Sequence, residues 1–451
     1  MIVEELARFA VDLRDRPLPD TVVHAAVRCT LDWFAAAVAG AGMEPVRLLT
    51  AAVSDEIGHG ESRLVLDGRP APARTAALIN GAAAHVAEVD DIYSPGLYHP
   101  GAPTIAAALA VAETRDVDGL AFLRALAIGY EVGDRLAAAI NPAHYRFWHT
   151  TGTIGALGAA AAVAEIRGLD VKRFAHALAT AATMGAGLQQ AFRSDAMSKP
   201  LHAGHAAEAG LLAARAAGAG FTGALDVLEG DAGFGRAMSG AVDWSSVTDE
   251  LGRDLRIMRT TIKPHVGCGH TFAPVDAALD LRARGIDPSR IRRIRVDSYR
   301  VAEQVAGISA PSTPFEAKFS TAFCVATAFV YGAVRLAAFD GSRLGDPALW
   351  RLIERTEHGV GDNFEAAFPG LRGASVTVTL DDGSQETATR WTRRGDPDDP
   401  LSDEELGDKF IELVGGVLDA ERATALATTL WALPELESVR RLGDIAAAAR
   451  V

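Results

Sequence analysis

Long Ala-rich segments dominate the first 250 or so residues, and apolar residues recur in them at the three- and four-residue spacing of helices. In the segment 19–34, for example, Asp20 is a candidate N-cap, and Gly40 and Gly42 end the pattern. Many apolar positions are Ala or Gly, whose small side chains let helices approach closely, although high-GC codon usage also enriches Ala. We therefore expect a compact bundle of mutually buried helices. Further helices are predicted over residues 74–88, 102–114, 120–136, 155–167, 171–190 and 206–217.

The pattern changes near residue 255. Residues 291–299 alternate apolar and polar side chains, as a half-exposed strand does. Residues 374–380 and 385–390 predict a hairpin with Asp382-Gly383 at its turn. Helices are expected at 271–284 and 320–336 between the strands, and at 403–417, 420–432 and 434–448 near the C-terminus.

These patterns predict a mainly α protein with a smaller α+β domain. The helical domain is expected to be discontinuous, comprising residues 1–255 and 401–451, because the last helices pack back on the first bundle. Residues 256–400 form the α+β domain.

Composition narrows the classes of function. The net charge of −14 argues against nucleic-acid binding. The three cysteines are far apart, which argues against a disulfide framework and favours a reducing, cytoplasmic compartment. The N-terminus Met-Ile-Val-Glu-Glu does not resemble a secretory signal, and apolar stretches such as 104–112 are too short to span a membrane.

Four polar segments interrupt the apolar sequence, and the first covers residues 88–100. It contains Glu88, Asp90, Asp91 and His99 among Pro and Gly residues, which predict a loop. One of two adjacent carboxylates can orient a neighbour while the other reaches a pocket. The alternative for each Asp is a helix cap or a turn, whereas for His99 a functional role is favoured.

The next two polar segments also carry histidines. His149 precedes Thr150-Thr151-Gly152-Thr153, which should open a helix, and backbone N–H groups at a helix start favour anions. Tyr145 lies just upstream as a candidate acid or base. Lys199 and His202 precede the helix expected from residue 206 and suit a carboxylate, whereas His-x-x-His alone is a weak indication of a metal.

The fourth segment contains Lys263, His265 and Cys268, at the expected junction of the two domains. Such junctions favour ligand clefts. A Lys with a lowered pKa suits proton abstraction beside a carboxylate, while Cys268 is expected to be passive. Titratable groups are costly to bury alone, so the four segments predict one cationic pocket built from separate loops. The sequence has no dinucleotide fingerprint, P-loop or nucleophile elbow.

Together these segments resemble the MmgE/PrpD family, which includes 2-methylcitrate dehydratase, cis-aconitate decarboxylase and an iminodisuccinate epimerase. The resemblance extends over nearly the whole chain. The matching pieces are Asn80–His85, Asp90-Asp91 with His99-Pro100, His149–Thr153 with Gly155–Gly158, Lys199–Gly204, Ile262-Lys263-Pro264 and Glu316–Ser320.

The resemblance implies a large helical domain with an α+β lid, a homodimer, no organic cofactor and a pocket between the domains. The expected catalytic residues are Lys263, His149, Tyr145, His99 and Asp91, and the expected substrate-binding residues are Lys199, His202, Asp90, Glu88, His265 and Cys268. The chain departs from decarboxylase-like members at Glu88, Cys268 and Phe323, where they carry Asp, His and Tyr. These departures argue against cis-aconitate decarboxylation as the activity, and they also weaken the case for 2-methylcitrate dehydration.

Three functions are compatible with this sequence. The leading one is a cofactor-free lyase that eliminates water from a small di- or tricarboxylate, with Lys263 or His149 as base. The second is an epimerase of a dicarboxylate, for which Tyr145 and Lys263 are candidate proton-transfer groups. The third is a catalytically silent homologue that binds a carboxylate.

Overall fold

The computed structural model describes residues 1–65, 67–192, 196–240 and 242–446. Within them the chain divides into two compact units, Met1–Ile262 with Ser402–Val451, and Lys263–Leu401. The expected division after residue 255 therefore falls after Ile262, and the expected return at residue 401 falls at Ser402.

The first unit is almost entirely helical, as its Ala-rich periodicity predicts. Carboxylates start three of its described helices, since Asp118, Asp170 and Asp419 each accept a backbone N–H from the first turn that follows. Its helices are α1 (Ile2–Arg14), α2 (Asp20–Ala41), α3 (Glu44–Ala52), α4 (Ala73–Val86), α5 (Gly101–Arg115), α6 (Gly119–Ile140), α7 (Thr150–Thr153), α8 (Gly155–Ile166), α9 (Val171–Ala182), α10 (Ser198–Gly218), α11 (Phe234–Met238), α12 (Ser245–Thr248), α20 (Asp403–Gly415), α21 (Ala420–Trp431) and α22 (Arg440–Ala446), and its short strands are β1 (Ser62–Arg63) and β2 (Pro70–Ala71).

Helices α4 and α10 cross closely in this unit, at two glycines. A Cβ on Gly81 would lie 3.0 Å from the Cα of Gly204, and a Cβ on Gly204 would lie 2.2 Å from the Leu78 carbonyl oxygen. Only glycine fits at such a distance, so the small residues have a packing function beyond helix propensity. On α4 the crossing lies four residues before His85, and on α10 it lies five residues after Lys199 and two after His202.

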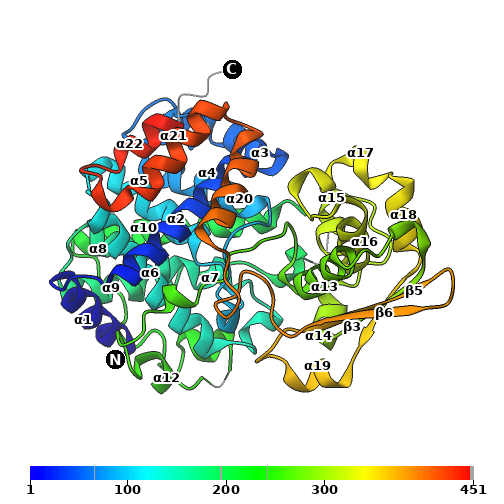
Figure 1. Cartoon of the computed structure of the whole chain (residues 1–451). Helices are drawn as coiled ribbons and strands as arrows, with labels where there is room; N and C mark the ends of the chain where they lie inside the picture. Colours follow the sequence, from blue (N-terminus) through cyan, green and yellow to red (C-terminus); the bar gives the residue numbers. More distant parts are fainter. Residues whose placement is uncertain (66, 193–195, 241, 447–451) are drawn as a thin grey trace. The chain divides into compact units, whose positions relative to one another are not determined.

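The C-terminal helices belong to the same unit, as the sequence patterns predict. Figure 1 shows α20 beside α2, and the two helices pack together. The buried Lys409 of α20 binds the carboxylate of Asp32 on α2 and donates to the Val89 carbonyl at 2.9 Å. Val89 directly precedes Asp90, so this last part of the chain holds the loop that carries the first polar segment.

Helix α2 is long and apolar enough to cross a bilayer by length and composition. However, 72% of its most apolar window is buried inside the structure, where it packs against α4, α6 and α20. This burial is typical of a core helix, and it explains why a 22-residue apolar helix occurs in this unit.

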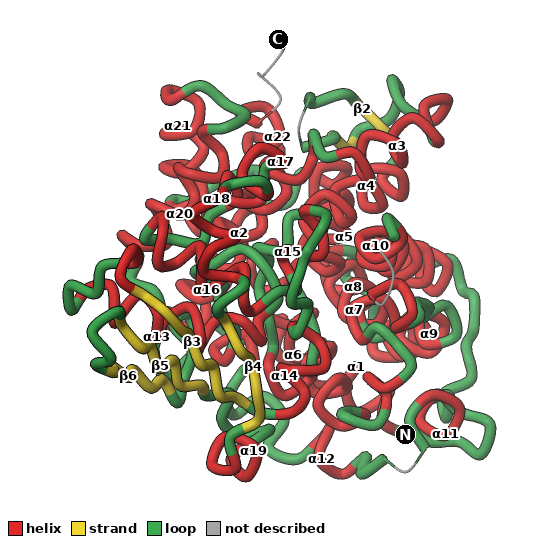
Figure 2. Tube along the Cα trace, turned by 90° about the vertical axis from the view of Figure 1, so that its right-hand side faces the viewer, coloured by secondary structure: helices red, strands yellow, loops and turns green. Residues whose placement is uncertain are grey.

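The second unit contains a four-stranded sheet in the order β4–β3–β5–β6. Figure 2 shows the four strands side by side. Strand β3 pairs parallel with β4 and antiparallel with β5, and β5 and β6 form the predicted hairpin around Gly383, whose φ is +84°. Helix α13 packs against β5 and β6, so the apolar residues of β5 are buried on that side. The elements are α13 (Phe272–Ala283), β3 (Ile291–Ser298), α14 (Arg300–Ala306), α15 (Pro314–Lys318), α16 (Thr321–Tyr331), α17 (Gly341–Leu344), α18 (Pro347–Ile353), β4 (Thr356–Val360), α19 (Asp362–Ala367), β5 (Ala374–Leu380) and β6 (Gln385–Arg390).

Several element boundaries differ from the sequence-based prediction. Helix α10 begins at Ser198 instead of residue 206, because Pro200 stands in the first turn, where its missing N–H removes no helical hydrogen bond. Helix α9 ends at Ala182 instead of residue 190, and strand β4 was not expected. The helix expected at 434–448 is observed as α22, and residues 447 and 448 lie outside the described residues.

The α4–α10 crossing generates a stability prediction. Gly204→Ala should lower the free energy of unfolding by about 1–3 kcal/mol, because the added methyl group overlaps the Leu78 carbonyl. The matched control is Gly407→Ala on α20, where an added Cβ would have no atom within 4 Å. Gly407→Ala should leave the free energy of unfolding unchanged or raise it by up to about 1 kcal/mol. Urea unfolding of both variants measures the difference, and equal effects would contradict the proposed close packing.

Candidate active site in the helical unit

The loop between α4 and α5 carries the first group of site residues. It is held by a pair of hydrogen bonds between Ile92 and Thr261, 2.9 and 2.8 Å long, and by a bridge between Tyr93 and Tyr98. Pro95 lies in a short 3-10 turn that reverses the chain. The loop therefore has a defined backbone, which positions the carboxylates before the turn against His99 after it.

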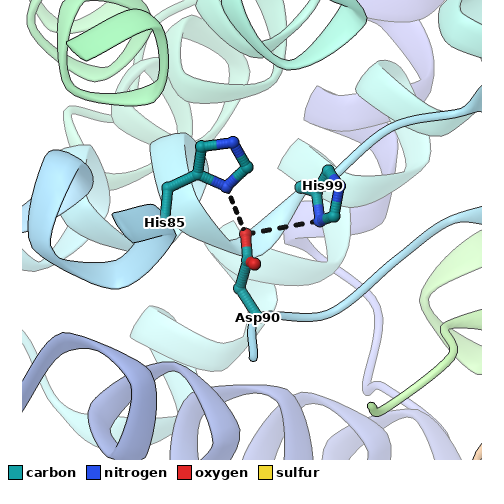
Figure 3. Close-up of side chains that lie close together, drawn as sticks. All are labelled: His85, Asp90 and His99. Atoms are coloured by element: carbon teal, nitrogen blue, oxygen red, sulfur yellow. Dashed lines mark hydrogen bonds and ion pairs between the residues drawn. The ribbon is translucent and has the colours of Figure 1, made fainter. Parts of the chain in front are cut away.

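The buried carboxylate of Asp90 lies between two imidazole rings (Figure 3). Its Oδ2 is 2.6 Å from Nδ1 of His85 and 3.3 Å from Nδ1 of His99. Nδ1 of His99 also lies 2.8 Å from the Asp91 carbonyl oxygen. Both rings therefore present Nδ1–H to oxygen acceptors, which leaves each Nε2 pointing away from Asp90.

Asp91 faces a different set of partners from Asp90. Its Oδ1 accepts the N–H of Gly101 at 3.0 Å, and its Oδ2 accepts the hydroxyl of Tyr130 at 2.6 Å. Burial raises the pKa of Asp91 to about 7, although the Tyr130 hydrogen bond opposes the shift. One oxygen of Asp91 thus binds the start of α5, and the other connects it to Tyr130 on α6. This arrangement corresponds to the helix-cap alternative that the sequence left open for Asp91.

A second pair of histidines joins α7 and α10. His149 is the N-cap residue of α7, its backbone N–H donates to the Gly187 carbonyl at 2.9 Å, and its Nδ1 lies 3.1 Å from Nδ1 of His202. Burial lowers the pKa of His149 well below its usual value and that of His202 to about 4, with the charge of His85 as the next cause in each. Both rings are therefore neutral near pH 7, and one Nδ1–H donates to the other nitrogen.

His85 connects these two groups. Its ring centroid is 5.0 Å from that of His99, in an edge-to-face arrangement, and 5.3 Å from that of His149, with the rings nearly parallel. His85 was not among the residues expected in the site. The sequence feature that could have identified His85 is its position as a polar residue on the Ala-rich helix, one turn after Gly81 and five residues before Asp90.

Lys199 and Glu88 form a buried ion pair beside the histidines. Lys199 lies in the first turn of α10, and its Nζ donates to Oε1 of Glu88. Glu88 has a backbone φ of +61°, a left-handed conformation that is uncommon for a non-glycine residue. The pairing satisfies the requirement that a buried charge have a partner.

The remaining expected residues are placed as follows. Tyr145 is half-buried, and its backbone N–H donates to Oδ1 of Asn141. Lys263 and Cys268 are buried in the second unit, where the N–H of Cys268 donates to the Lys318 carbonyl. His265 Nε2 lies 2.8 Å from Asp276 Oδ1, and Phe323 packs on Phe339. The structure therefore brings together Glu88, Asp90, His99, His149, Lys199 and His202 in the helical unit, with His85 added.

His85, Asp90 and His99 also offer three donor atoms within 4.8 Å of one another, a possible metal-ligand set. Ligands about 2.0–2.1 Å from a tetrahedral ion stand roughly 3.3 Å apart. The His85–Asp90 separation of 2.6 Å is shorter and has the length of a charge-assisted hydrogen bond. The observed geometry fits direct hydrogen bonding better than a shared ion.

Two family models match successive parts of the chain. Residues 4–246 match the family model for the MmgE/PrpD N-terminal domain, and residues 265–433 match that for the C-terminal domain. The second match includes α20 and α21, which pack in the helical unit.

Curated relatives match over almost the full length of the chain. A cis-aconitate decarboxylase-like protein, oryM, from Aspergillus oryzae is 27% identical over 98% of this chain and 96% of its own length. The cis-aconitate decarboxylase of Mus musculus is 26% identical, over 97% of this chain and 91% of its own length. That of Homo sapiens is 27% identical, over 97% and 92% respectively.

Asp91 generates a prediction about the pH dependence of stability. Its pKa is about 7 in the folded protein against an ordinary 3.8, so the folded state binds this proton more tightly than the unfolded state. Its contribution to stability therefore falls as the pH rises from about 4 to about 7. Asp91→Asn removes this loss and should stabilise the protein by roughly 2–4 kcal/mol at pH 8, with little gain at pH 4.

The measurement is urea unfolding of the wild type and Asp91→Asn at several pH values. Asp118→Asn is the control, because Asp118 is an exposed N-cap carboxylate on the neighbouring α6. Its effect should change little over the same range. A constant difference between Asp91→Asn and the wild type from pH 4 to pH 8 would contradict the prediction.

Proposed function

The chain belongs to the MmgE/PrpD family, and on that premise we propose that it is a lyase acting on a small di- or tricarboxylate. The leading reaction is elimination of water by acid–base chemistry of the protein's own side chains. The observation that carries the proposal is the pair of neutral imidazoles, the buried His149 and the half-buried His202, beside the Lys199–Glu88 ion pair. It provides an unprotonated base next to cationic groups, which proton abstraction alpha to a carboxylate requires.

In the proposed reaction His149 removes a proton from the carbon next to a carboxylate. The electron pair left on that carbon is delocalised into the carboxylate, and positive side chains stabilise the resulting aci-carboxylate. This electron pair then forms the carbon–carbon double bond as the hydroxyl on the adjacent carbon leaves. An acid protonates the hydroxyl, so the products are an unsaturated carboxylate and water.

The ion pair between Lys199 and Glu88 affects how a substrate carboxylate can bind. Because Glu88 already balances Lys199, a substrate carboxylate that approaches Lys199 competes with an internal anion. Lys199 therefore shares its charge between Glu88 and the substrate. We propose Lys263 as a carboxylate clamp on the basis of its sequence motif, Ile262-Lys263-Pro264.

Decarboxylation is the second candidate, because the curated relatives are named for cis-aconitate decarboxylation. It also develops negative charge beside a carboxylate, but carbon dioxide leaves in place of water.

Incubation with a panel of hydroxylated di- and tricarboxylates and cis-aconitate in deuterated water separates these reactions. An alkene without carbon dioxide supports dehydration, and carbon dioxide supports decarboxylation. Deuterium at a retained, inverted carbon identifies an epimerase, and binding without turnover identifies a silent homologue; either result would overturn the lyase proposal.

The base assignment predicts the effect of His149→Asn. The Asn amide preserves a polar partner for His202 but has no basic nitrogen. We expect turnover to fall by about 10²–10⁴-fold with a smaller change in KM, the usual loss on removing a general base. Turnover kinetics measures the effect, with the melting temperature as the control for folding. Turnover within a few-fold of the wild type would remove His149 as the base.

Lys263 generates a separate prediction. As a carboxylate clamp it needs a positive charge and no loss of its proton, so Lys263→Arg should retain appreciable turnover with a raised KM. Lys263→Ala should lose most kcat/KM. Loss of turnover in both variants, with an unchanged melting temperature, would assign Lys263 as the base instead. Activity of Lys263→Ala close to that of the wild type would exclude Lys263 from the mechanism.

A further inference from the structure

His85 is completely buried at the end of α4, in the middle of a row of imidazole rings. Its Nδ1 contacts Asp90 at 2.6 Å, as Figure 3 shows, and its ring faces His149. The row continues from His149 to His202, whose ring centroids are 5.3 Å apart. His85 thus links the Asp90 carboxylate to the pair that contains the proposed base.

Packing alone does not account for a histidine at this position. Nε2 of His85 is buried and has no hydrogen-bond partner among the residues that the structure describes. An unsatisfied buried polar atom costs about 1–3 kcal/mol. The buried His144 behaves as a structural histidine does, since its ring nitrogens contact the Met238 carbonyl and the Thr153 hydroxyl.

The contact with Asp90 gives His85 an electrostatic role. A buried carboxylate 2.6 Å from Nδ1 stabilises positive charge on the imidazole ring. A positive charge on the His85 ring would lie one ring spacing from His149 and would oppose the addition of a proton there. Burial lowers the pKa of His149 most, and His85 is the first charged group to add to that effect.

The other charged and titratable groups around His149 come from two further segments, the α4–α5 loop and α10. His99 lies in the loop before α5, and Lys199 and His202 lie on α10; each also lowers the pKa of His149. The neighbouring anions are engaged with cations or imidazoles, Glu88 with Lys199 and Asp90 with His85 and His99. His85 is the group among them that combines a carboxylate contact with a nearly parallel ring on His149.

We propose that His85 is a positioning residue that acts through His149: Asp90 holds a positive His85 ring against His149, which keeps His149 in place and unprotonated for proton abstraction. This role deepens the proposed function and rests on it. His85 itself transfers no proton to or from the substrate in this scheme.

The variant that tests this role is His85→Asn. The Asn amide N–H replaces Nδ1–H as a donor to Asp90, while the ring and its charge are lost. Removing a neighbouring positive charge makes protonation of His149 easier, so its titration midpoint should rise. A unit charge about 5 Å away at an effective dielectric constant of about 20 corresponds to a rise of roughly two pH units.

The primary measurement is NMR titration of His149 in substrate-free protein with ¹⁵N-labelled histidine, the signal being identified by its loss in His149→Asn. This readout needs no substrate, so it remains informative if no carboxylate is turned over and the proposed function fails. With an active substrate, the acidic limb of the kcat/KM profile should move to higher pH by the same amount. A merely structural role would lower stability without moving either midpoint.

His176→Asn is the matched control, because His176 is a largely buried helical histidine on α9 whose Nδ1 contacts the Gly223 carbonyl. It should leave the His149 midpoint unchanged. An unchanged midpoint in folded His85→Asn would overturn the proposal. If His85→Asn does not fold, the ring ¹⁵N shifts of His85 in the wild type decide the matter: an imidazolium at pH 7 supports the proposal, and a neutral ring overturns it.

Discussion

The close approach of α4 and α10 at Gly81 and Gly204 is the constraint on which the candidate site depends. Helices with larger residues at this crossing would stand further apart, because the Leu78 carbonyl already lies where a Cβ on Gly204 would be. The crossing brings the end of α4, with His85, close to the first turn of α10, with Lys199 and His202. The Ala and Gly content of the helices thus determines the separation of polar groups as well as the packing of apolar ones.

Three carboxylates within four residues of the α4–α5 loop have three different environments. Glu88 pairs with Lys199, Asp90 accepts from His85 and His99, and Asp91 accepts from Tyr130 and the start of α5. Burial of several acids in an Ala-rich core is unfavourable unless each has a partner. The partners therefore differ: Asp91 binds the start of α5 and Tyr130, whereas Glu88 pairs with a lysine and Asp90 with two imidazoles.

The C-terminal segment completes this arrangement from a distant part of the sequence. Lys409 is 377 residues from Asp32 and 320 from Val89, yet it contacts both. Its position explains why the helical unit includes residues that the C-terminal family model covers. The site loop is therefore held by Thr261 through Ile92 and by the returning helix α20 through Val89.

The sequence by itself determined the fold class, the order of most helices, the β5–β6 hairpin and the segments that carry chemistry. These follow from local patterns: helical periodicity, alternation, and turn residues such as Asp382-Gly383. It also marked His99, His149, Lys199 and His202 as site residues, because polar groups that interrupt apolar helices require partners. The structure places all four in the helical unit, while their chemical roles are still predictions.

Only the tertiary structure decided which side chains pair. His149 and His202 are 53 residues apart, and Glu88 and Lys199 are 111 apart, so no local pattern links them. The start of α10 was misplaced because Pro200 favours an extended predecessor in most contexts, yet it is accepted in a first turn. His85 was missed because a single histidine on an apolar helix has no function until another segment supplies its carboxylate and its neighbouring rings. Those contacts depend on how closely two helices approach, a distance that periodicity does not encode.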